Sequence, residues 1–304
     1  MDRTRDYVGY ADSPPVFDWP YGARLAVSLV VNYEEGSEYS HSHGDDRQEN
    51  AGEWGPKDFP AGVPNLANES FFEYGSRVGF WRLMRLFERH EVPVTFGVCA
   101  VALEKNPAAA RAIAESKQGH EVCAHGYRWE EHYRLTRDEE RERISKAVAS
   151  IRKTTGSRPL GWYCRTSPSV HTRELLIEEG GFEYDSDAYN DDLPYLVEAG
   201  GRDRAHVVVP YTGDANDSGA WRSGGYETDF DRYLIESFDV LYEESREVPR
   251  MLSVGIHLRI AGRPGRIGAL DRFLRHARAR SGVWFATRLQ IARAFRNAVE
   301  SGGE

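Results

Sequence analysis

The run from Arg24 to Val31, RLAVSLVV, constrains the fold more than any other stretch of this chain. It is almost continuously apolar, which is typical of a strand covered on both faces by other elements, as in parallel sheets and barrels. The run ends in residues 32–36, NYEEG, so two carboxylates directly follow a buried strand. We therefore expect an α/β fold with polar chemistry at the end of this strand.

The same pattern of strand and helix recurs along the chain. Phe80, Leu83 and Phe87 recur at helical spacing, and Thr136 with Glu139 forms a plausible capping box at the start of another helix. Further strands are predicted at 94–100, 120–125, 161–164, 182–187, 206–209, 251–256 and 283–286, and helices at 76–90, 107–116, 136–154, 172–179, 229–244, 267–280 and 288–298. About eight such alternations favour a parallel (β/α) barrel over an open sheet.

No internal repeat or clear linker divides the 304 residues, so we expect a single domain over 1–304. Residues 1–23 are rich in Pro, Gly and aromatic residues and are predicted to form an irregular arm across the barrel. Residues 37–68 show no hydrophobic period and are predicted to form a long loop or lid, a common place for substrate contacts.

The net charge of -9, with Lys and Arg scattered among acids, argues against nucleic acid or an anionic membrane as a partner. No apolar run is long enough to span a bilayer, and the charged N-terminus does not resemble a signal peptide. We therefore expect a soluble, cytoplasmic protein. Its odd number of cysteines, Cys99, Cys123 and Cys164, predicts reduced, buried thiols, and no CxxC pair suggests zinc.

Polar residues gather at the ends of the predicted strands. The stretch at 119–126, GHEVCAHG, is predicted to deliver His125 at its end, where Gly126 lets the backbone turn. The residues at or just beyond such strand ends are Glu34, Glu35, His125, Arg165, Asp185, Asp187 and His257. One acid after a strand usually caps a helix, but this combination at the rim of a barrel predicts a shared catalytic site.

Chemically, this set meets the requirements of amide hydrolysis. A carboxylate or an imidazole can take a proton from water, an arginine or a protonated histidine can hold the oxyanion, and a second histidine can protonate the leaving nitrogen. Glu34 and Glu35, if held close, would raise each other's pKa and keep one carboxyl protonated and able to donate.

At these residues the chain resembles the polysaccharide deacetylase (NodB homology) superfamily, whose fold is a distorted (β/α) barrel, and within it the metal-independent allantoinase branch. The matching stretches run in order over nearly the whole chain: residues 32–36, 69–77, 125–129, 161–163, 184–187, 191–195 and 262–264. The resemblance implies a hydrolase of non-peptide carbon–nitrogen bonds, and it suggests a homo-oligomer.

Carried over residue by residue, the resemblance puts Glu34 in the place of the catalytic base and Glu35 in that of a metal-binding aspartate. It puts His125 and Trp129 at the two histidines of the metal motif, and His257 at the histidine that assists the leaving group. Tryptophan cannot ligate a metal, and Glu35 with His125 is an incomplete set for a catalytic zinc, which normally takes three protein ligands. We therefore expect neither a metal nor another cofactor.

The leading hypothesis is metal-independent opening of a small cyclic amide, such as an allantoin-like ureide or a cyclic imide. Glu34 or Glu35 would activate water, His125 and His257 would transfer protons, and Arg165 would hold the oxyanion or a substrate carboxylate. Arg165 lies one place nearer its strand than in the allantoinase pattern, so the substrate could be another ureide or imide. Substrate contacts are predicted from Asn32, Tyr127, Trp129, Trp162 and Asp187.

Two alternatives stay open at this point. A metal-dependent deacetylase of an N-acetylated sugar or small metabolite would need a replacement ligand, for which His257 and His132 are the candidates. A non-catalytic relative would bind a ligand through the same rim without turnover.

Overall fold

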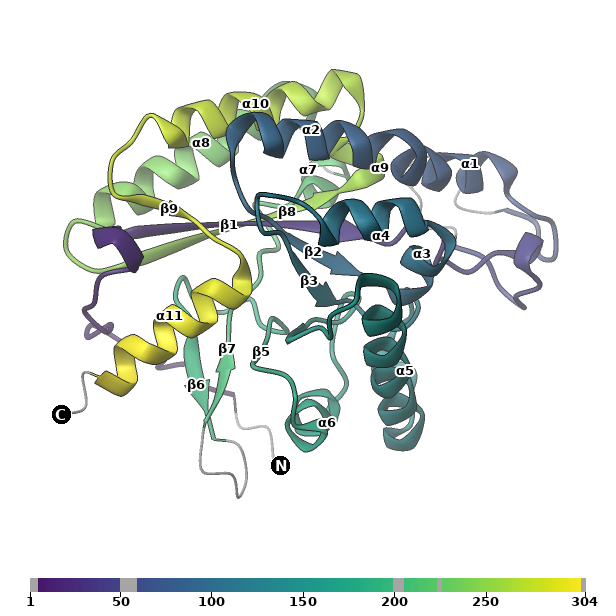
Figure 1. Ribbon diagram of the computed structural model, residues 1–304, viewed down its shortest axis with the longest axis horizontal. Helices are drawn as coiled ribbons and strands as arrows, with labels where there is room; N and C mark the ends of the chain where they lie inside the picture. Colours follow the sequence, from purple (N-terminus) through teal and green to yellow (C-terminus); the bar gives the residue numbers. More distant parts are fainter. Residues whose placement is uncertain (1–4, 50–58, 199–204, 223–225, 302–304) are drawn as a thin grey trace.

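A curled and mostly parallel sheet forms the centre of the protein (Figure 1). The computed structural model describes residues 5–49, 59–198, 205–222 and 226–301. The strands follow the order β6-β7-β5-β4-β3-β2-β1-β8, with β9 also paired to β1. Among the strand pairs of the described residues, only β6–β7 is antiparallel. Their bounds are β1 Leu25–Tyr33, β2 Thr95–Val98, β3 Glu121–Ala124, β4 Gly161–Trp162, β5 Tyr184–Asp185, β6 Tyr195–Val197, β7 His206–Val208, β8 Arg250–His257 and β9 Val283–Phe285.

Helices connect these strands and cover the outside of the sheet (Figure 1). They are α1 Leu66–Tyr74, α2 Phe80–His90, α3 Ala100–Lys105, α4 Pro107–Ala114, α5 Arg137–Thr155, α6 Thr172–Glu179, α7 Asp217–Arg222, α8 Tyr226–Glu244, α9 Leu258–Ala261, α10 Pro264–Arg278 and α11 Arg288–Ser301. Short turns of other helix types lie at η1 Pro20–Gly22, η2 His41–His43, η3 Gly75–Gly79 and η4 His132–Arg134. The α/β barrel predicted from the sequence is confirmed in this curled form.

Strand β1 pairs with neighbours on both of its edges. Along one edge it pairs with β8 over eight residues, and along the other with β2 near its carboxyl end and β9 near its start. In the β1–β8 ladder Asn32 lies opposite His257. The acids that follow β1 and the histidine that ends β8 therefore leave the sheet side by side.

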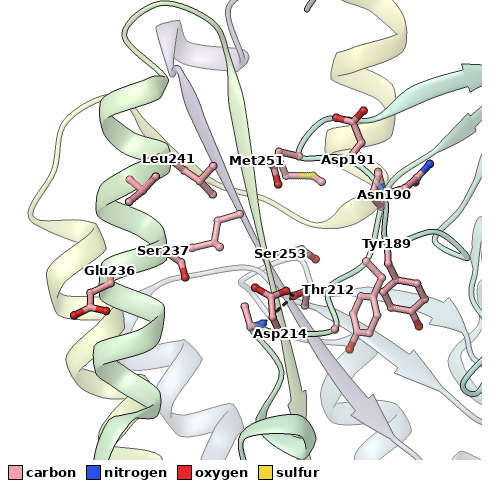
Figure 2. A pocket seen from close by; sticks show the side chains of 17 residues that line it. Tyr189, Asn190, Asp191, Thr212, Asp214, Glu236, Ser237, Leu241, Met251 and Ser253 are labelled. Atoms are coloured by element: carbon pink, nitrogen blue, oxygen red, sulfur yellow. Dashed lines mark hydrogen bonds between the residues drawn. The ribbon is translucent and has the colours of Figure 1, made fainter. Parts of the chain in front are cut away.

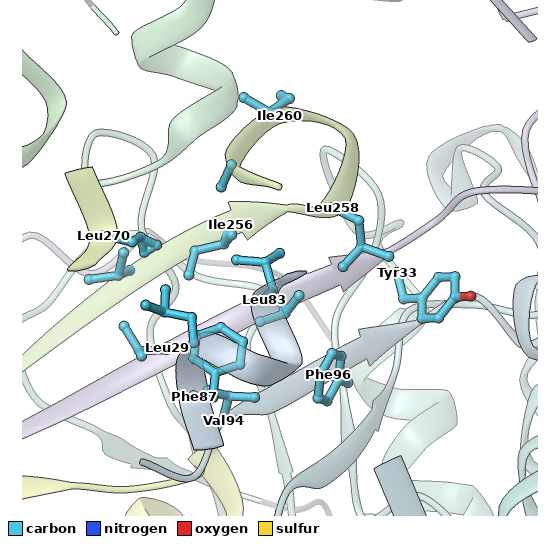
Figure 3. Packing of buried hydrophobic residues seen from close by; sticks show 14 of the residues in the cluster. Leu29, Tyr33, Leu83, Phe87, Val94, Phe96, Ile256, Leu258, Ile260 and Leu270 are labelled. Atoms are coloured by element: carbon cyan, nitrogen blue, oxygen red, sulfur yellow. The ribbon is translucent and has the colours of Figure 1, made fainter. Parts of the chain in front are cut away.

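The alternation of side chains along β1 determines which of them point into the barrel. The odd-numbered residues, such as Leu29 and Tyr33, pack outward in the large core under the helices, together with Leu83 and Phe87 of α2 (Figure 3). The even-numbered residues face inward, where Val30 packs with side chains of the other strands. Because successive side chains of a strand point to opposite faces, continuing the alternation places Asn32 and Glu34 inside.

The segment between β7 and α7 runs along β8, where Asn216 forms an isolated bridge with Gly255 and the Gly255 N–H donates to the Ala215 carbonyl. A Cβ on Gly255 would lie 2.4 Å from Asn216 Nδ2 and 2.6 Å from the Tyr211 hydroxyl. Only glycine lets these side chains approach the strand so closely.

The structure corrects several sequence-based boundaries. The helix predicted over 76–90 is the last part of a helical stretch that begins at Leu66, because the Asn65 side chain accepts a hydrogen bond from the Asn68 N–H and caps α1. The predicted loop over 37–68 therefore ends at Asn65. The strands predicted at 161–164 and 182–187 shrink to two residues each, and β6 was not predicted. Residues 1–4 of the predicted arm and 50–58 of the predicted loop lie outside the described residues.

None of the helices that the structure describes is long and apolar enough to cross a membrane. The three cysteines are buried and free, as the sequence predicts.

Candidate active site

Two histidine side chains meet one carboxylate oxygen at the carboxyl ends of β1, β3 and β8. His125 Nε2 lies 3.4 Å from Glu34 Oε1, and His257 Nε2 lies 3.5 Å from the same oxygen. The three residues are buried, with 3%, 8% and 2% of the surface of His125, His257 and Glu34 exposed. The structure therefore brings three predicted site residues into one enclosed cluster.

His257 is backed by a carboxylate that the sequence analysis did not select. Asp217, the first residue of α7, lies with Oδ1 2.6 Å from His257 Nδ1, and its Oδ2 accepts the His257 N–H at 2.8 Å. Burial alone would lower the pKa of His257, but Glu34 and Asp217 outweigh it and raise the pKa to about 10. At neutral pH the ring is an imidazolium whose Nε2–H faces Glu34.

His125 has a neutral partner in place of an acid. Its Nδ1 lies 3.0 Å from the Tyr163 carbonyl oxygen, and its ring stacks on the Tyr163 ring with centroids 4.0 Å apart. A carbonyl only accepts, so Nδ1 carries the hydrogen in the neutral ring, and the lone pair is on Nε2, toward Glu34. Asn32 Oδ1 accepts a hydrogen bond from the Tyr163 hydroxyl, and Asn32 Nδ2 donates one to the Tyr211 hydroxyl at 3.1 Å.

Arg259, in α9, forms the cationic side of the cluster. Its Nη1 lies 2.7 Å from Glu34 Oε2 and 3.4 Å from Glu35 Oε1, and its backbone N–H donates to Glu35 Oε1 at 3.1 Å. Only 2% of the residue surface is exposed. The guanidinium carbon lies 4.4 Å from the ring centroid of Phe72 and 5.3 Å from that of Trp129.

The two adjacent carboxyls differ in protonation. Burial would raise the pKa of Glu34, but Arg259 and His257 outweigh it and hold the pKa well below its usual range. Burial raises the pKa of Glu35 to about 7, with Arg259 opposing and Glu34 adding to the shift. Glu35 lies against Gly75, where a Cβ would come within 2.5 Å of its Oε1.

Arg165 and Trp129 lie beside the cluster. The Arg165 guanidinium stacks 3.6 Å from the Trp129 ring centroid, and it pairs with Glu49 at 2.5 Å. It also donates to the Trp129 carbonyl at 3.0 Å. Trp129 therefore has two guanidinium groups near its ring, those of Arg165 and Arg259. Arg165 contacts the loop and the indole, and none of its described interactions is with Glu34.

The remaining predicted substrate contacts are not part of this cluster. Trp162 is fully buried in a separate core with Phe182, and its indole N–H lies 3.2 Å from Cys164 Sγ. Tyr127 packs against the same core. Asp187 accepts the Cys164 N–H at 2.7 Å, and burial, with Asp185 adding, raises its pKa to about 7.

Comparison with known proteins identifies the family. The polysaccharide deacetylase family model matches residues 69–177. A Schizosaccharomyces pombe protein that carries the name polysaccharide deacetylase is 40% identical over 97% of this chain and 98% of its own. The chain belongs to the polysaccharide deacetylase family.

Two solved structures are similar over almost the full length. A protein named probable polysaccharide deacetylase, from Pseudomonas aeruginosa PAO1, superposes with a TM-score of 0.90 at 44% identity, covering 96% of this chain and 98% of that one. PuuE allantoinase also reaches a TM-score of 0.90 at 42% identity, covering 98% of both chains. The predicted family is confirmed, and the protein is a hydrolase of carbon–nitrogen bonds.

The side chains at the metal positions implied by the sequence resemblance do not fit a metal ion. Trp129 offers no ligand, and both Glu35 oxygens accept N–H groups, from Arg259 and from Glu34. A guanidinium already lies against the two acids. The side chains left to ligate a metal at these positions, Glu35 and His125, are fewer than the three protein ligands that a catalytic zinc normally requires.

His132, one predicted replacement ligand, lies elsewhere. Among the described residues, one group of three ligand types has donor atoms within 4.8 Å of one another, and it consists of His132, Glu140 and Cys164. Glu140 accepts hydrogen bonds from the Ser169 and Thr172 hydroxyls at 2.5 Å each. The group fastens α5 to the loop before α6 and does not involve Glu34.

Two hollows open beside the site. A cavity of about 660 Å³ lies between β8, α8 and the loops around Tyr189 and Thr212. Figure 2 shows the side chains that line it. Tyr211 lines this cavity, and its hydroxyl also accepts a hydrogen bond from the Asn32 amide. A groove of about 730 Å³ lies between α1 and the start of α10, lined by Phe71, Tyr74 and Arg263 among others.

Two members of the cluster, Asp217 and Arg259, were missed by sequence reasoning. Arg259 follows His257 by two positions and could have been found by extending the strand-end criterion past the last strand residue. Asp217 stands in a polar segment with Asp214 and Asn216, and nothing in its spacing distinguishes it from them.

Proposed function

We propose that this protein opens a small cyclic amide, of the allantoin or cyclic imide type, by hydrolysis without a metal ion. The observation that carries the proposal is that the imidazoles of His125 and His257 both face Glu34 Oε1 but have different partners at their other nitrogen. His257 has an acid behind it and His125 has a carbonyl behind it. One ring can donate a proton while the other can accept one, which general acid–base hydrolysis of an amide requires.

In this mechanism His125 Nε2 takes a proton from water as the water oxygen bonds to the ring carbonyl carbon. Glu34, at 3.4 Å, stabilises the imidazolium that forms. His257 then gives its Nε2 proton to the ring nitrogen as the carbon–nitrogen bond breaks, and Asp217 holds that ring in place. Transfer of a proton from His125 to His257, relayed by Glu34 or by solvent, restores the starting state.

The burial of the site supports a small substrate. Glu34, His125 and His257 are buried. The loop that directly follows the two acids is held by Arg128, which donates hydrogen bonds to the Ser37 and Glu38 carbonyls. A polymer would have to displace more of these surroundings than a ring of a few atoms. The similarity to PuuE allantoinase over 98% of both chains points to the same substrate class.

A substrate panel tests the proposal. Purified protein would be assayed with allantoin, hydantoin and succinimide, and with N-acetylglucosamine oligomers, each before and after removal of metal by chelation. We expect ring opening of at least one cyclic amide that survives chelation. Acetate release from the oligomers, lost on chelation, would instead establish a metal-dependent deacetylase.

A carboxylate variant links the activity to this site. Glu34→Gln should abolish turnover, because a neutral amide cannot stabilise either imidazolium. Glu183→Gln is the matched control, since Glu183 pairs with Arg293 on the surface at 2.6 Å. Retained ligand binding with no turnover of any amide by the wild type would point to the non-catalytic alternative.

A further inference from the structure

Arg259 occupies an unusual place for a buried arginine. It contacts or faces side chains at three positions where the family resemblance places the base and the metal site, namely Glu34, Glu35 and Trp129. Phe72 of α1 covers it from another side at 4.4 Å. Elements that are distant in the sequence therefore enclose one fixed cation.

The charges around it leave little room for a second cation. Glu34 Oε2 lies 2.7 Å from the Arg259 guanidinium, Glu35 accepts the Arg259 backbone N–H, and His257 Nδ1 lies 2.6 Å from Asp217 Oδ1. A buried charge is retained only where opposite charges and hydrogen bonds compensate it. Arg259 supplies this compensation for the two acids, and a divalent ion in the same place would be repelled by the guanidinium.

We propose that the Arg259 guanidinium takes the place of the catalytic metal ion in this protein, pairing with Glu34 and Glu35 and excluding a divalent cation. This inference rests on the proposed metal-free function. Two replacements then belong together. Trp129 stands where the family has a metal-binding histidine, and Arg259 supplies the positive charge that the metal would bring.

Replacing the metal ion by a guanidinium changes what the site can do. A guanidinium is planar and always charged, so it holds the Glu34 carboxylate in a fixed geometry. It does not generate hydroxide from a bound water as a metal ion does. Activation of water therefore falls to His125, and Arg259 acts through Glu34 as a positioning residue.

Measurements of zinc binding and of activity test whether Arg259 replaces the metal ion. Wild type, Arg259→Ala and Arg259→Lys would be titrated with zinc against a chromogenic chelator, with Arg272→Ala as control. Arg272 pairs with Asp231 at the surface, and its side chain is 61% exposed. Ring opening would be measured after chelation, with and without millimolar guanidinium chloride, at ionic strength matched with KCl.

We expect Arg259→Ala to lose about 100-fold or more in kcat/KM, in the range seen when one preorganised electrostatic group is removed. Guanidinium, and not KCl, should restore part of the activity, and Arg259→Lys should retain more than Arg259→Ala. Because the two acids lose their cation, Arg259→Ala should bind zinc at least about tenfold more tightly than the wild type. Arg272→Ala should match the wild type in every measurement.

Two results would overturn the inference. One is an Arg259→Ala protein with wild-type activity and wild-type zinc affinity. The other is stoichiometric zinc binding by the wild type that Glu35→Gln abolishes, a measurement that stands even where Arg259 variants fail to fold. Absence of ring opening by the wild type would refute the proposed function alone, since the zinc titration does not depend on turnover.

Discussion

Replacing Asp217 by asparagine isolates the role of the acid behind His257. The substitution keeps the size of the side chain and removes its charge, so the 2.6 Å contact to Nδ1 loses its charge-assisted character. Such a bond contributes about 1.5–3 kcal/mol. If His257 is the general acid, kcat/KM should fall by roughly 10- to 100-fold, since about 1.4 kcal/mol corresponds to a factor of ten.

The pH dependence gives the direction of the effect. In the wild type the pKa of His257 is raised to about 10, so the protonated acid persists until the pH rises through that value. Without the Asp217 charge the pKa falls, and the alkaline limb of the kcat/KM profile should move to lower pH. The stability that this raised pKa contributes is complete below about pH 6.5, the ordinary value for histidine, and is lost as the pH rises through about 10. The Tm difference between the two proteins should therefore be larger at pH 6 than at pH 10.5.

Asp239→Asn provides the matched control. Asp239 makes the same kind of contact, 2.7 Å to His276 Nε2, but this pair is partly exposed between α8 and α10. Its removal should leave the activity profile unchanged. An Asp217→Asn enzyme with kcat/KM within twofold of the wild type, and with an unmoved alkaline limb, would refute the assignment of His257 as the acid.

Two further substitutions test the surroundings of the site. Trp162→Phe should lower the free energy of unfolding by about 1–3 kcal/mol by leaving a gap in the core, with KM unchanged; a raised KM at unchanged stability would return Trp162 to the substrate contacts. Arg128 donates to the Ser37 and Glu38 carbonyls and pairs with Asp45, so Arg128→Ala should raise KM and speed limited proteolysis within residues 37–49. Unchanged cleavage there would show that other contacts hold the loop.

Strand ends could be predicted from the sequence because their pattern is local. Short stretches with clear periodicity predict the apolar run of β1 and the acids after it. They also predict the histidine after β3 and the histidine that ends β8. In a barrel the carboxyl ends of parallel strands meet at one rim, and Glu34, His125 and His257 do meet there.

The choice of Trp162 shows where such reasoning fails. Strand β4 spans only two residues, so the alternation that decides which side chain faces inward is hard to read from the sequence. Trp162 faces the outer core, and the next residue, Tyr163, stacks on His125. A shift of one residue moves a side chain to the other face of a sheet.

The partners of Asp217 and Arg259 could not be predicted from the sequence, because they come from distant segments. Asp217 meets His257 across 40 positions, and Arg259 meets Glu34 across 225. Only the folded chain brings these charges together. Arg165 is predicted at the rim from the end of its strand, and in the structure its guanidinium pairs with Glu49, an acid of the predicted loop over 37–68.

Ring opening measured against metal content tests the central claim most directly. The wild-type protein would be stripped with chelator, its zinc, iron and manganese quantified, and its kcat/KM for allantoin and succinimide compared with that of untreated protein. If His125, His257 and Glu34 carry out the hydrolysis, kcat/KM stays the same at vanishing metal content and does not increase when zinc is added back. Activity that disappears with the metal and returns in proportion to added zinc would contradict a metal-independent mechanism.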